Sequence, residues 1–583
     1  MRVRWASWGL LVLLWALACA GGRPAGRALP DAAARGPAPL TVVTVSDLHG
    51  QILPKRLTTP DGATVEVGGA RWLGAYIARV RETAPGPVLV VDAGDLFQGT
   101  LESNLGEGAA VIALYRALGI DAAALGNHEF DYGPVGEAVT PGSAEDDPRG
   151  ALKARIREAS FPILACNVIE QKTGRLPAWL RPSVLVERGG VRIGVVGAAG
   201  VDTPTTTVGA NLVGLDFLDP APCIAEEAAK LRARGARWVV ATVHIGAACA
   251  AEPSHGEAGC HDSGLLELAR RLGAGSIDLL VGGHTHQRVA RIIDGLPVIE
   301  AWARGQAIGV VQLDRRGPPR LEIVSTCGAV VRDAEGRSGC DPQLVRHAVS
   351  DPQPAVFRGK RMAPDARAEA AVAPWVKAVA AKKAEPLGVE ASAEIWAAYL
   401  DESPLGNLVA GLLRKAVPGA DVGMTNGGGL RAPLPAGPLT YGNVYEALPF
   451  DNRLAILHVD GATLRRIVQL GVSGGHGGLS WDGLSFETQG CQVGKIWVQG
   501  KPLDPKARYE VVTNDYLARG GSGFADLGLK PEEVELRPDL PILRDVVAAG
   551  LRAHGGHLDP AAFYNPEAPR QRKQGRCDIG RKR

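Results

Sequence analysis

The chain has 583 residues, with 64 basic and 62 acidic side chains, a net charge of +2 and 46% hydrophobic residues. This length exceeds one ordinary hydrophobic core, so we expect two large domains or three small ones. The balanced charge argues against a dedicated nucleic-acid binder, and the apolar content predicts a globular chain rather than a disordered one.

The first residues have the organisation of a secretory signal peptide. Arg2 and Arg4 precede a short apolar run over 8–18, and small residues follow it. The run is too short to span a bilayer comfortably. We therefore predict a signal peptide over 1–18 and a flexible tether over 19–38, which is rich in Ala, Gly, Pro and Arg.

The stretch ALACAGG also resembles a bacterial lipobox, with Cys19 as the lipid acceptor and Ala16 where Leu is usual. This favours a lipoprotein, and cleavage to a free secreted protein is the alternative. In both cases we expect an exported protein that is periplasmic, lipid-anchored at the bacterial envelope, or extracellular. Its contact with the membrane would be limited to a lipid on Cys19.

Cysteine usage also indicates export. Nine cysteines leave an even number when Cys19 is set aside. Cys249/Cys260 and Cys327/Cys340 are each close in sequence and flanked by Gly, Ser or Asp, so an oxidising compartment would allow them as local disulfides. Buried free thiols are the alternative, and the sequence does not determine the connectivity.

Residues 39–340 alternate short apolar runs with helical segments, which is typical of a layered α/β domain. Helices are predicted over 69–83 and 108–118. Five runs end in polar residues and are predicted as buried strands, namely PLTVVTVSD, PVLVVDAGD, VRIGVVGAAG, RWVVATVHIG and IDLLVGGHTH.

The amino-acid composition changes after residue 340. The Ala-rich region 341–395 is predicted as a linker helix with loose ends, and 396–560 as a second, smaller α/β domain. The basic residues of 561–583 predict a solvated, flexible tail.

Potential metal ligands follow four of the predicted strands, and the run GNHEFD adds a fifth polar group. In chain order the polar groups are Asp47 and His49 (SDLHG), Asp92 and Asp95 (DAGDLFQG), Asn127, His128, Glu129 and Asp131 (GNHEFD), His244 (TVHIG), and His284 and His286 (VGGHTHQ). Side chains that follow strands converge at one edge of an α/β sheet. Any single one of them, Asp92 above all, is ordinarily a turn or capping residue, but the ordered set predicts a shared site.

This ordered set resembles the calcineurin-like metallophosphoesterase superfamily. The GNHEFD form and the second domain are similar to the family of 5′-nucleotidases, cyclic-nucleotide phosphodiesterases and UDP-sugar hydrolases, over about residues 40–530. The implied fold is α/β: a layered β-sandwich metallophosphoesterase domain flanked by helices, plus a smaller α/β C-terminal substrate-binding domain. The implied activity is phosphate release from nucleotides by a dimetal phosphohydrolase, with metal-bound hydroxide as the nucleophile.

The resemblance implies two divalent metal ions. Asp47, His49, Asp95 and His286 would hold one ion, and Asp95, Asn127, His244 and His284 would hold the other, with Asp95 bridging. This mixed nitrogen and oxygen set suits Mn, Zn or Fe better than Ca or Mg. His128 would face the phosphoryl oxygens, Asp131 would orient it, and Glu129 would stand behind the ligands.

The resemblance also implies a substrate pocket in the second domain. Asn426 and Arg431 (TNGGGLRAPL) would bind the phosphate, and Phe450 (ALPFDN) and Tyr516 (TNDYLARGGSGF) would stack on the base. The alternatives are a surface Arg beside a tight turn and two core aromatics. The partner implied is a small-molecule phosphate ester, a nucleotide in the first instance, and no nucleic acid.

Two positions of the expected substrate pocket depart from the family pattern. Ser522 (GGSGF) stands where nucleotide-cleaving members usually have Asp, and Asp401 precedes Glu402 where a second phosphate-side Arg is frequent. An altered substrate pocket is therefore expected. The alternatives are a 2′,3′-cyclic-nucleotide phosphodiesterase or a UDP-sugar hydrolase, and with less support a thiosulfohydrolase of sulfur oxidation. A non-enzymatic binder is disfavoured because every ligand position is filled.

Overall fold

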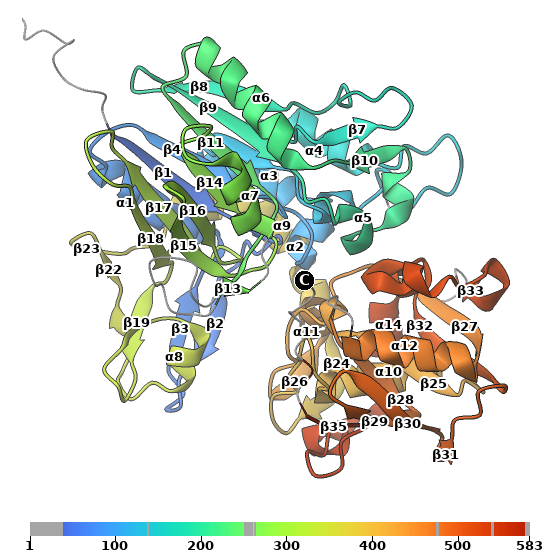
Figure 1. Cartoon of the computed structure of the whole chain (residues 1–583). Coiled ribbons are helices and arrows are strands. Elements are labelled where there is room, and N and C mark those ends of the chain that lie inside the picture. The colour runs from blue at the N-terminus through green and yellow to red at the C-terminus, as the bar shows by residue number, and fades with distance from the viewer. Residues whose placement is uncertain are drawn as a thin grey trace, which may run out of the picture.

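The computed structural model describes residues 39–136, 139–249, 260–261, 264–473, 477–537, 541–575 and 577. The predicted signal peptide over 1–18, the lipid acceptor Cys19 and the tether over 19–38 lie outside the described residues. Within the described ranges, no helix has the length and apolar character needed to cross a membrane. Figure 1 shows two lobes, the N-terminal one in blue and green and the C-terminal one in orange and red.

The N-terminal lobe contains two six-stranded sheets. The first has the order β18 (Arg320–Ser325), β17 (Ala307–Leu313), β1 (Leu40–Val45), β4 (Val88–Asp92), β5 (Ala122–Ala124) and β6 (Ile163–Leu164). The second has the order β15 (Arg288–Ile293), β16 (Leu296–Ala301), β14 (Leu279–Gly282), β11 (Trp238–Val243), β9 (Val191–Ala198) and β8 (Ser183–Arg188). The five strands predicted from the sequence are β1, β4, β9, β11 and β14.

Alternating side chains explain why the two sheets stack. In β1, Leu40 and Val42 join one apolar cluster with residues of the second sheet, whereas Val43 and Val45 join a cluster with the helices outside. These helices are α1 (Gly69–Thr83) and α3 (Ala109–Leu118). Helices α6 (Pro220–Ala233) and α7 (Gly264–Leu272) cover the second sheet on its outer face. The result is the predicted layered α/β sandwich.

Among the described residues, the N-terminal lobe also contains four short strand pairs outside the two large sheets. They are β2 (Lys55–Thr58) with β3 (Thr64–Val67), β7 (Val168–Glu170) with β10 (Leu215–Phe217), β12 (Ala248–Cys249) with β13 (Cys260–His261), and β22 (Val356–Phe357) with β23 (Lys360–Arg361). A further small sheet has the order β20 (Ser338–Gly339), β19 (Ala329–Arg332) and β21 (Gln353–Pro354). The first part of the region 341–395 therefore pairs with the N-terminal lobe.

The long helix of that region is α9 (Ala366–Lys383), and it is held firmly at both ends. Asp365 caps its start by accepting hydrogen bonds from the backbone N–H groups of Arg367 and Ala368. Ala368 and Val372 are buried in the core of the N-terminal lobe, whereas Val379 is buried in that of the C-terminal lobe. The helix thus joins the two cores where the lobes meet (Figure 1) and does not have the loose ends predicted from the sequence.

The C-terminal lobe is built on a five-stranded sheet of order β28 (Leu479–Asp482), β25 (Val422–Asn426), β32 (Arg508–Asn514), β27 (Leu454–Asp460) and β33 (Val534–Leu536). Helices α10 (Pro404–Ala416) and α14 (Leu543–His554) contribute to one core, and α12 (Gly461–Ser473) to another. Two smaller sheets complete the lobe. They are β26 (Gly437–Thr440), β24 (Pro386–Ala391) and β34 (Gly556–Leu558), and β31 (Lys501–Pro502), β30 (Gln492–Val498), β29 (Leu484–Gln489) and β35 (Gln571–Gln574).

Strand β35 corrects one expectation from the sequence. The tail over 561–583 is predicted to be solvated and flexible, but its residues 571–574 pair in parallel with β29. The strand is held against the C-terminal lobe because Gln571 is buried there and Cys577 forms a disulfide with Cys491.

Four disulfides cross-link the described residues. They are Cys166–Cys223, Cys249–Cys260, Cys327–Cys340 and Cys491–Cys577. Both local pairs considered from the sequence are therefore formed. The other two join residues 57 and 86 positions apart, which no local spacing rule could have found.

The contact between the two large sheets should dominate the stability of the N-terminal lobe. Ile193 is fully buried there, so Ile193→Ala should lower the free energy of unfolding by about 2–5 kcal/mol. Val213→Ala is the control, because Val213 is 69% exposed and its truncation should change little. Urea unfolding of both variants measures the difference, and equal losses would contradict the assignment of this core.

Candidate active site

The candidate metal ligands follow the carboxyl ends of strands in both sheets of the N-terminal lobe. Asp47, His49, Asp95, His284 and His286 all have positive φ angles, between 49° and 80°. This left-handed region is costly for residues other than glycine and is concentrated at functional sites. The turns bend the chain sharply, so that side chains from distant strands point into one space.

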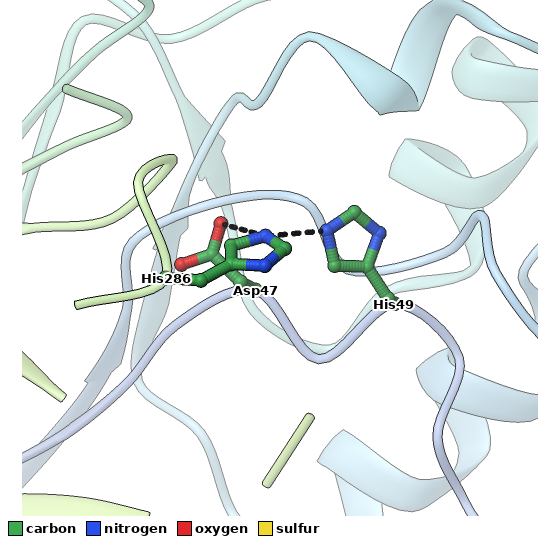
Figure 2. A group of neighbouring side chains, drawn as sticks. All are labelled: Asp47, His49 and His286. Atoms are coloured by element: carbon green, nitrogen blue, oxygen red, sulfur yellow. Dashed lines mark hydrogen bonds and ion pairs between the residues drawn. The ribbon is translucent and has the colours of Figure 1, made fainter. Parts of the chain in front are cut away.

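Asp47, His49 and His286 form the first group, with ligand atoms within 4.8 Å of one another. Figure 2 shows the ring of His286 between the Asp47 carboxylate and the ring of His49. The Nε2 atoms of the two rings are 3.0 Å apart, and Nε2 of His286 is 3.5 Å from Oδ1 of Asp47. Nδ1 of His49 lies 2.8 Å from the carbonyl oxygen of Gln98, which leaves Nε2 for a ligand.

Asp95, His244 and His284 form the second group, again with ligand atoms within 4.8 Å of one another. Oδ1 of Asn127 joins them, at 2.9 Å from Nε2 of His244 and 3.1 Å from Nδ1 of His284. Nδ1 of His244 lies 2.8 Å from the carbonyl oxygen of Ala93, which orients this ring as Gln98 orients His49. Asp95 lies between the groups, because its Oδ2 is 3.1 Å from Nε2 of His244 and 3.7 Å from Nε2 of His49.

The chemistry of these donors fits metal ions. Asp47 is fully buried, and its Oδ2 has no hydrogen-bond partner among the described residues. Such an orphaned oxygen is costly unless a cation compensates it. Burial, followed by the charge of Arg431, holds the pKa of His49 well below its usual range, so its imidazole is neutral and has a lone pair to share. The structure therefore contains two candidate metal sites.

Glu129 ties the ligand loops together. Its buried carboxylate accepts hydrogen bonds from the backbone N–H groups of Asp95, Leu96 and Gly126, at 3.0, 2.6 and 2.7 Å. Gly126 is required at this crossing, because a Cβ atom there would lie 2.3 Å from the backbone nitrogen of Asp95. Burial, then the charge of Asp95, raises the pKa of Glu129 to about 7.

His128 faces the cavity and is paired with Asp131. Its Nδ1 lies 2.6 Å from Oδ2 of Asp131, and the other oxygen of Asp131 accepts a 2.6 Å hydrogen bond from Thr207. Burial opposes the charged ring, but the carboxylates of Asp131 and Asp95 outweigh it and raise the pKa of His128. The pairing at Nδ1 leaves Nε2 of His128 for a substrate.

Two carboxylates at this site were missed by sequence reasoning. Glu300 accepts hydrogen bonds from Gln287 N–H and from the Thr285 hydroxyl, both at 2.8 Å, and so braces the turn that carries His284 and His286. Oδ2 of Asp202 lies 3.0 Å from Nε2 of His284. The sequence contained a signal for each of these two residues. Glu300 is an acidic residue inside the apolar run LPVIEA, and Asp202 follows the predicted strand VRIGVVGAAG.

Asp92, in contrast, has a structural role, as expected for a lone aspartate at the end of a strand. It accepts hydrogen bonds from Gly94 N–H and from the Tyr115 hydroxyl, at 2.7 and 2.6 Å. Burial raises its pKa to about 8. Its side chain therefore supports the β4 turn and is not among the two ligand groups.

A cavity of about 1440 Å³ covers the metal-ligand groups, and both lobes line it. From the N-terminal lobe come Asp95, Asn127, His128, Asp131, His284 and His286, and from the C-terminal lobe come Asn426, Arg431, Phe450 and Tyr516. All four substrate residues expected from the sequence thus share one cavity with the predicted catalytic pair.

Arg431 and Phe450 lie close to the ligand groups. Nη2 of Arg431 is 3.3 Å from Nε2 of His49, and its Cζ is 5.7 Å from the centre of the Phe450 ring. The Phe450 ring is in turn 5.4 Å from that of His128. The guanidinium of Arg431 therefore extends from the C-terminal lobe to the first ligand group.

Tyr516 reaches across the interface between the lobes. Its hydroxyl donates a 2.7 Å hydrogen bond to the carbonyl oxygen of Thr205 and accepts one from the backbone N–H of Ser522 at 3.2 Å. Its ring lies against Gly521, where a Cβ atom would be 2.4 Å from the ring. Asn426 lies deeper, with its Oδ1 3.3 Å from Nδ2 of Asn514.

The structure corrects the interpretation of Asp401. Its side chain is 72% exposed and pairs with Lys573 at 2.5 Å, and it is not among the residues that line the cavity. The loop instead places Tyr399 and Leu400 in the cavity wall, two positions that sequence reasoning did not single out. Ser522 does line the cavity, at a positive φ of 51°.

The hydrogen bonds of Glu129 lead to a prediction about metal affinity. In Glu129→Gln, the amide NH₂ would face backbone N–H groups that now donate to a carboxylate. Metal affinity should fall by about 10–100-fold, as for other partners that orient ligands. Equilibrium dialysis with elemental analysis measures this loss. Glu158→Gln is the control, since Glu158 pairs only at the surface with Arg155; equal metal loss in both variants would contradict the role of Glu129.

Comparisons with known proteins agree with this geometry. Residues 40–288 match the family model of the calcineurin-like phosphoesterases, and residues 379–528 match that of the 5′-nucleotidase C-terminal domain. The two matched segments correspond to the two lobes that enclose the cavity.

Individual relatives cover most of the chain. A probable 5′-nucleotidase of Treponema pallidum (strain Nichols) is 26% identical over 84% of this chain and 87% of its own length. The endonuclease YhcR of Bacillus subtilis (strain 168) is also 26% identical over 84% of this chain, which spans only 38% of that longer protein. The crystal structure of a 5′-nucleotidase precursor from Thermus thermophilus is similar with a TM-score of 0.71 and 26% identity, over 92% of this chain and 99% of that one. The protein therefore belongs to the 5′-nucleotidase family of the calcineurin-like metallophosphoesterases and is a phosphoric ester hydrolase.

Proposed function

We propose that this protein is an exported, two-metal phosphohydrolase that releases phosphate from nucleotides. One observation carries the proposal: two ligand groups meet at Asp95 beneath a cavity into which the other lobe extends Arg431. The spacing of the groups suits a pair of ions that acts on one phosphoryl centre.

The residues present favour Mn, Zn or Fe. Asp47, His49, Asp95 and His286 would hold one ion, and Asp95, Asn127, His244 and His284 would hold the other. Imidazole nitrogens mixed with carboxylate and amide oxygens suit these metals better than Ca or Mg. When bound, the ions supply Lewis-acid charge that polarises the phosphoryl oxygens and activates water.

The chain's own residues supply the remaining chemistry. Arg431 would hold phosphoryl oxygens with a planar guanidinium, which suits two parallel hydrogen bonds. His128 would donate a proton from Nε2 to the leaving oxygen, since its Nδ1 is held by Asp131. Asp131 would stabilise the protonated ring before that transfer.

The aromatic side chains support a nucleotide as the substrate. Phe450 and Tyr516 line the cavity beside the phosphate site, and stacking on their rings would accept different bases. Asn426 would supply a polar contact near the phosphate. Ser522, which stands where an acidic residue is usual, would weaken the hold on the sugar.

Export is supported by covalent structure as well as by the predicted signal peptide. Four disulfides link the described residues, and such bonds persist in oxidising compartments. A lipid on Cys19 would keep the enzyme at the bacterial envelope.

Substrate identity and metal dependence are tested in one assay. The Mn-loaded protein should release phosphate from AMP, and treatment with a chelator should abolish this activity until Mn is restored. UDP-glucose, 2′,3′-cyclic AMP and an aryl phosphate should be assayed in parallel. Activity that survives complete metal removal would contradict the two-metal proposal. Cleavage of the aryl phosphate without any cleavage of AMP would contradict the proposal that the substrate is a nucleotide.

The role of His128 is tested by His128→Asn. Because the proton donor is lost while the ligands remain, turnover should fall by about 10²–10⁴-fold. Metal content should stay at the wild-type value. Asp131→Asn is the companion variant and should lower turnover in the same direction by a smaller factor. Loss of metal from His128→Asn would show instead that His128 is a ligand.

A further inference from the structure

The loop that follows β16 contacts the first ligand group and the C-terminal lobe, and the chemistry proposed above does not use it. Two of its residues, Trp302 and Arg304, have positive φ angles of 68° and 58°. Such angles are costly for residues other than glycine and are concentrated at functional sites. The surrounding structure must therefore hold this loop in its conformation.

Hydrogen bonds to the turns of the first ligand group hold the loop. The N–H of Trp302 donates to the carbonyl oxygen of Gln287 at 2.8 Å, and its carbonyl oxygen accepts from the Ser46 hydroxyl at 2.7 Å. The backbone N–H of Arg304 donates a 2.7 Å hydrogen bond to the carbonyl oxygen of Asp47. Ser46 and Gln287 are direct neighbours of candidate ligands in the chain, so the loop is fixed to the metal-ligand turns.

The side chain of Arg304 extends from this loop to the other lobe. Its Nη2 donates a 2.7 Å hydrogen bond to the backbone carbonyl oxygen of Arg431. The backbone N–H of Arg431 donates a 2.8 Å hydrogen bond to the carbonyl oxygen of Ala447, within the C-terminal lobe. The backbone of Arg431 is therefore held by one contact from each lobe.

The segment that carries Arg431 needs such external support. It joins β25 to β26, and its one short helical turn consists of the glycine run Gly427–Gly429. Glycine has more backbone freedom than any other residue, so the local sequence does not fix the path of the chain towards Arg431. Since Nη2 of Arg431 lies 3.3 Å from Nε2 of His49, a shift of this backbone would move the guanidinium relative to the first ligand group.

The charge of Arg304 favours a functional role over a stabilising one. Arg304 is partly buried, and no carboxylate of the described residues forms an ion pair with it. Burial, followed by the charge of Arg431, lowers the pKa of Arg304 to about 10, and the side chain remains charged at neutral pH. A partly buried cation beside a second cation is costly, so a gain in stability does not account for this arrangement.

We propose that Arg304 is a positioning residue that sets the place of the Arg431 guanidinium relative to the first ligand group. It contacts the Asp47 turn through its backbone and the Arg431 backbone through its side chain. This inference rests on the proposed function, in which Arg431 holds the phosphoryl oxygens. Because Arg304 is not among the residues that line the cavity, it acts through Arg431 and not on the substrate.

A double-mutant cycle tests this dependence, with inorganic phosphate titrated calorimetrically into the Mn-loaded protein. Arg304→Met removes a charge-assisted hydrogen bond, so it should weaken phosphate binding by about tenfold or more. Arg431→Met should weaken the binding further. When Arg431→Met is already present, adding Arg304→Met should change the Kd by less than about twofold, because Arg304 would have no guanidinium left to position.

Arg346→Met is the matched control. Arg346 also extends from the N-terminal lobe towards the C-terminal one, where it lies 3.5 Å from Glu394, and it does not line the cavity. The substitution removes the same charge and should leave phosphate binding unchanged. Arg304→Lys keeps a charged donor, so it should retain part of the affinity that Arg304→Met loses, and it replaces Arg304→Met in the cycle if that variant is unstable.

Two further measurements separate the possible outcomes. Elemental analysis should find the wild-type metal content in Arg304→Met, since the bond to Asp47 is made by the backbone and is retained. Assays with AMP and 4-nitrophenyl phosphate test the proposed function separately: if the wild type binds phosphate but hydrolyses neither ester, that function fails, and the cycle still decides the role of Arg304.

Four results would overturn the positioning role. They are a wild type that does not bind phosphate, an Arg304→Met variant that binds it as the wild type does, an equal loss of binding with and without the Arg431 side chain, and an equal loss in Arg346→Met. The third result would show that Arg304 acts by its own charge and not through Arg431.

Discussion

Four backbone N–H groups converge on the buried carboxylate of Glu129, the weakest from Phe97 at 3.4 Å, and this arrangement fixes the spacing of the candidate metal site. The three closest donors belong to Asp95, Leu96 and Gly126, which lie in the turns after β4 and β5. Hydrogen bonds from buried N–H groups to a carboxylate are strong, and the same N–H groups would destabilise the fold if they were left unpaired. Asp95, which lies between the two candidate ligand groups, is therefore positioned by a residue that does not line the cavity.

A similar logic applies to the histidine ligands. His49 and His244 each present Nδ1 to a backbone carbonyl, and His284 presents Nε2 to Asp202. In each case one ring nitrogen is held so that the other faces the ligand group. Glu300 extends this support to the turn of His284 and His286. The site depends on a layer of outer hydrogen bonds as much as on the ligands themselves.

The residues proposed to bind the substrate come from the other lobe and are positioned by different means. Arg431 and Tyr399 lie on loops of the C-terminal lobe that glycines bring into close contact, whereas the candidate metal ligands all belong to the N-terminal lobe. Helix α9 joins the two cores, and Tyr516 bonds to Thr205 across the interface. The separation allows Ser522 to depart from the family pattern in one lobe while every candidate ligand position in the other lobe is filled.

The sequence by itself determined the layered α/β fold, four of the strands that precede candidate ligands (β1, β4, β11 and β14) and the ordered set of metal-ligating residue types, because the polar residues at a strand end follow the strand at a short spacing. It also indicated that Asn426, Arg431, Phe450 and Tyr516 belong to a substrate pocket. Only the tertiary structure decided that Tyr399 faces the cavity while Asp401 faces Lys573, that 571–574 form a strand, and which distant cysteines pair. These outcomes depend on contacts between segments far apart in the chain, where side-chain direction follows from packing and not from local periodicity.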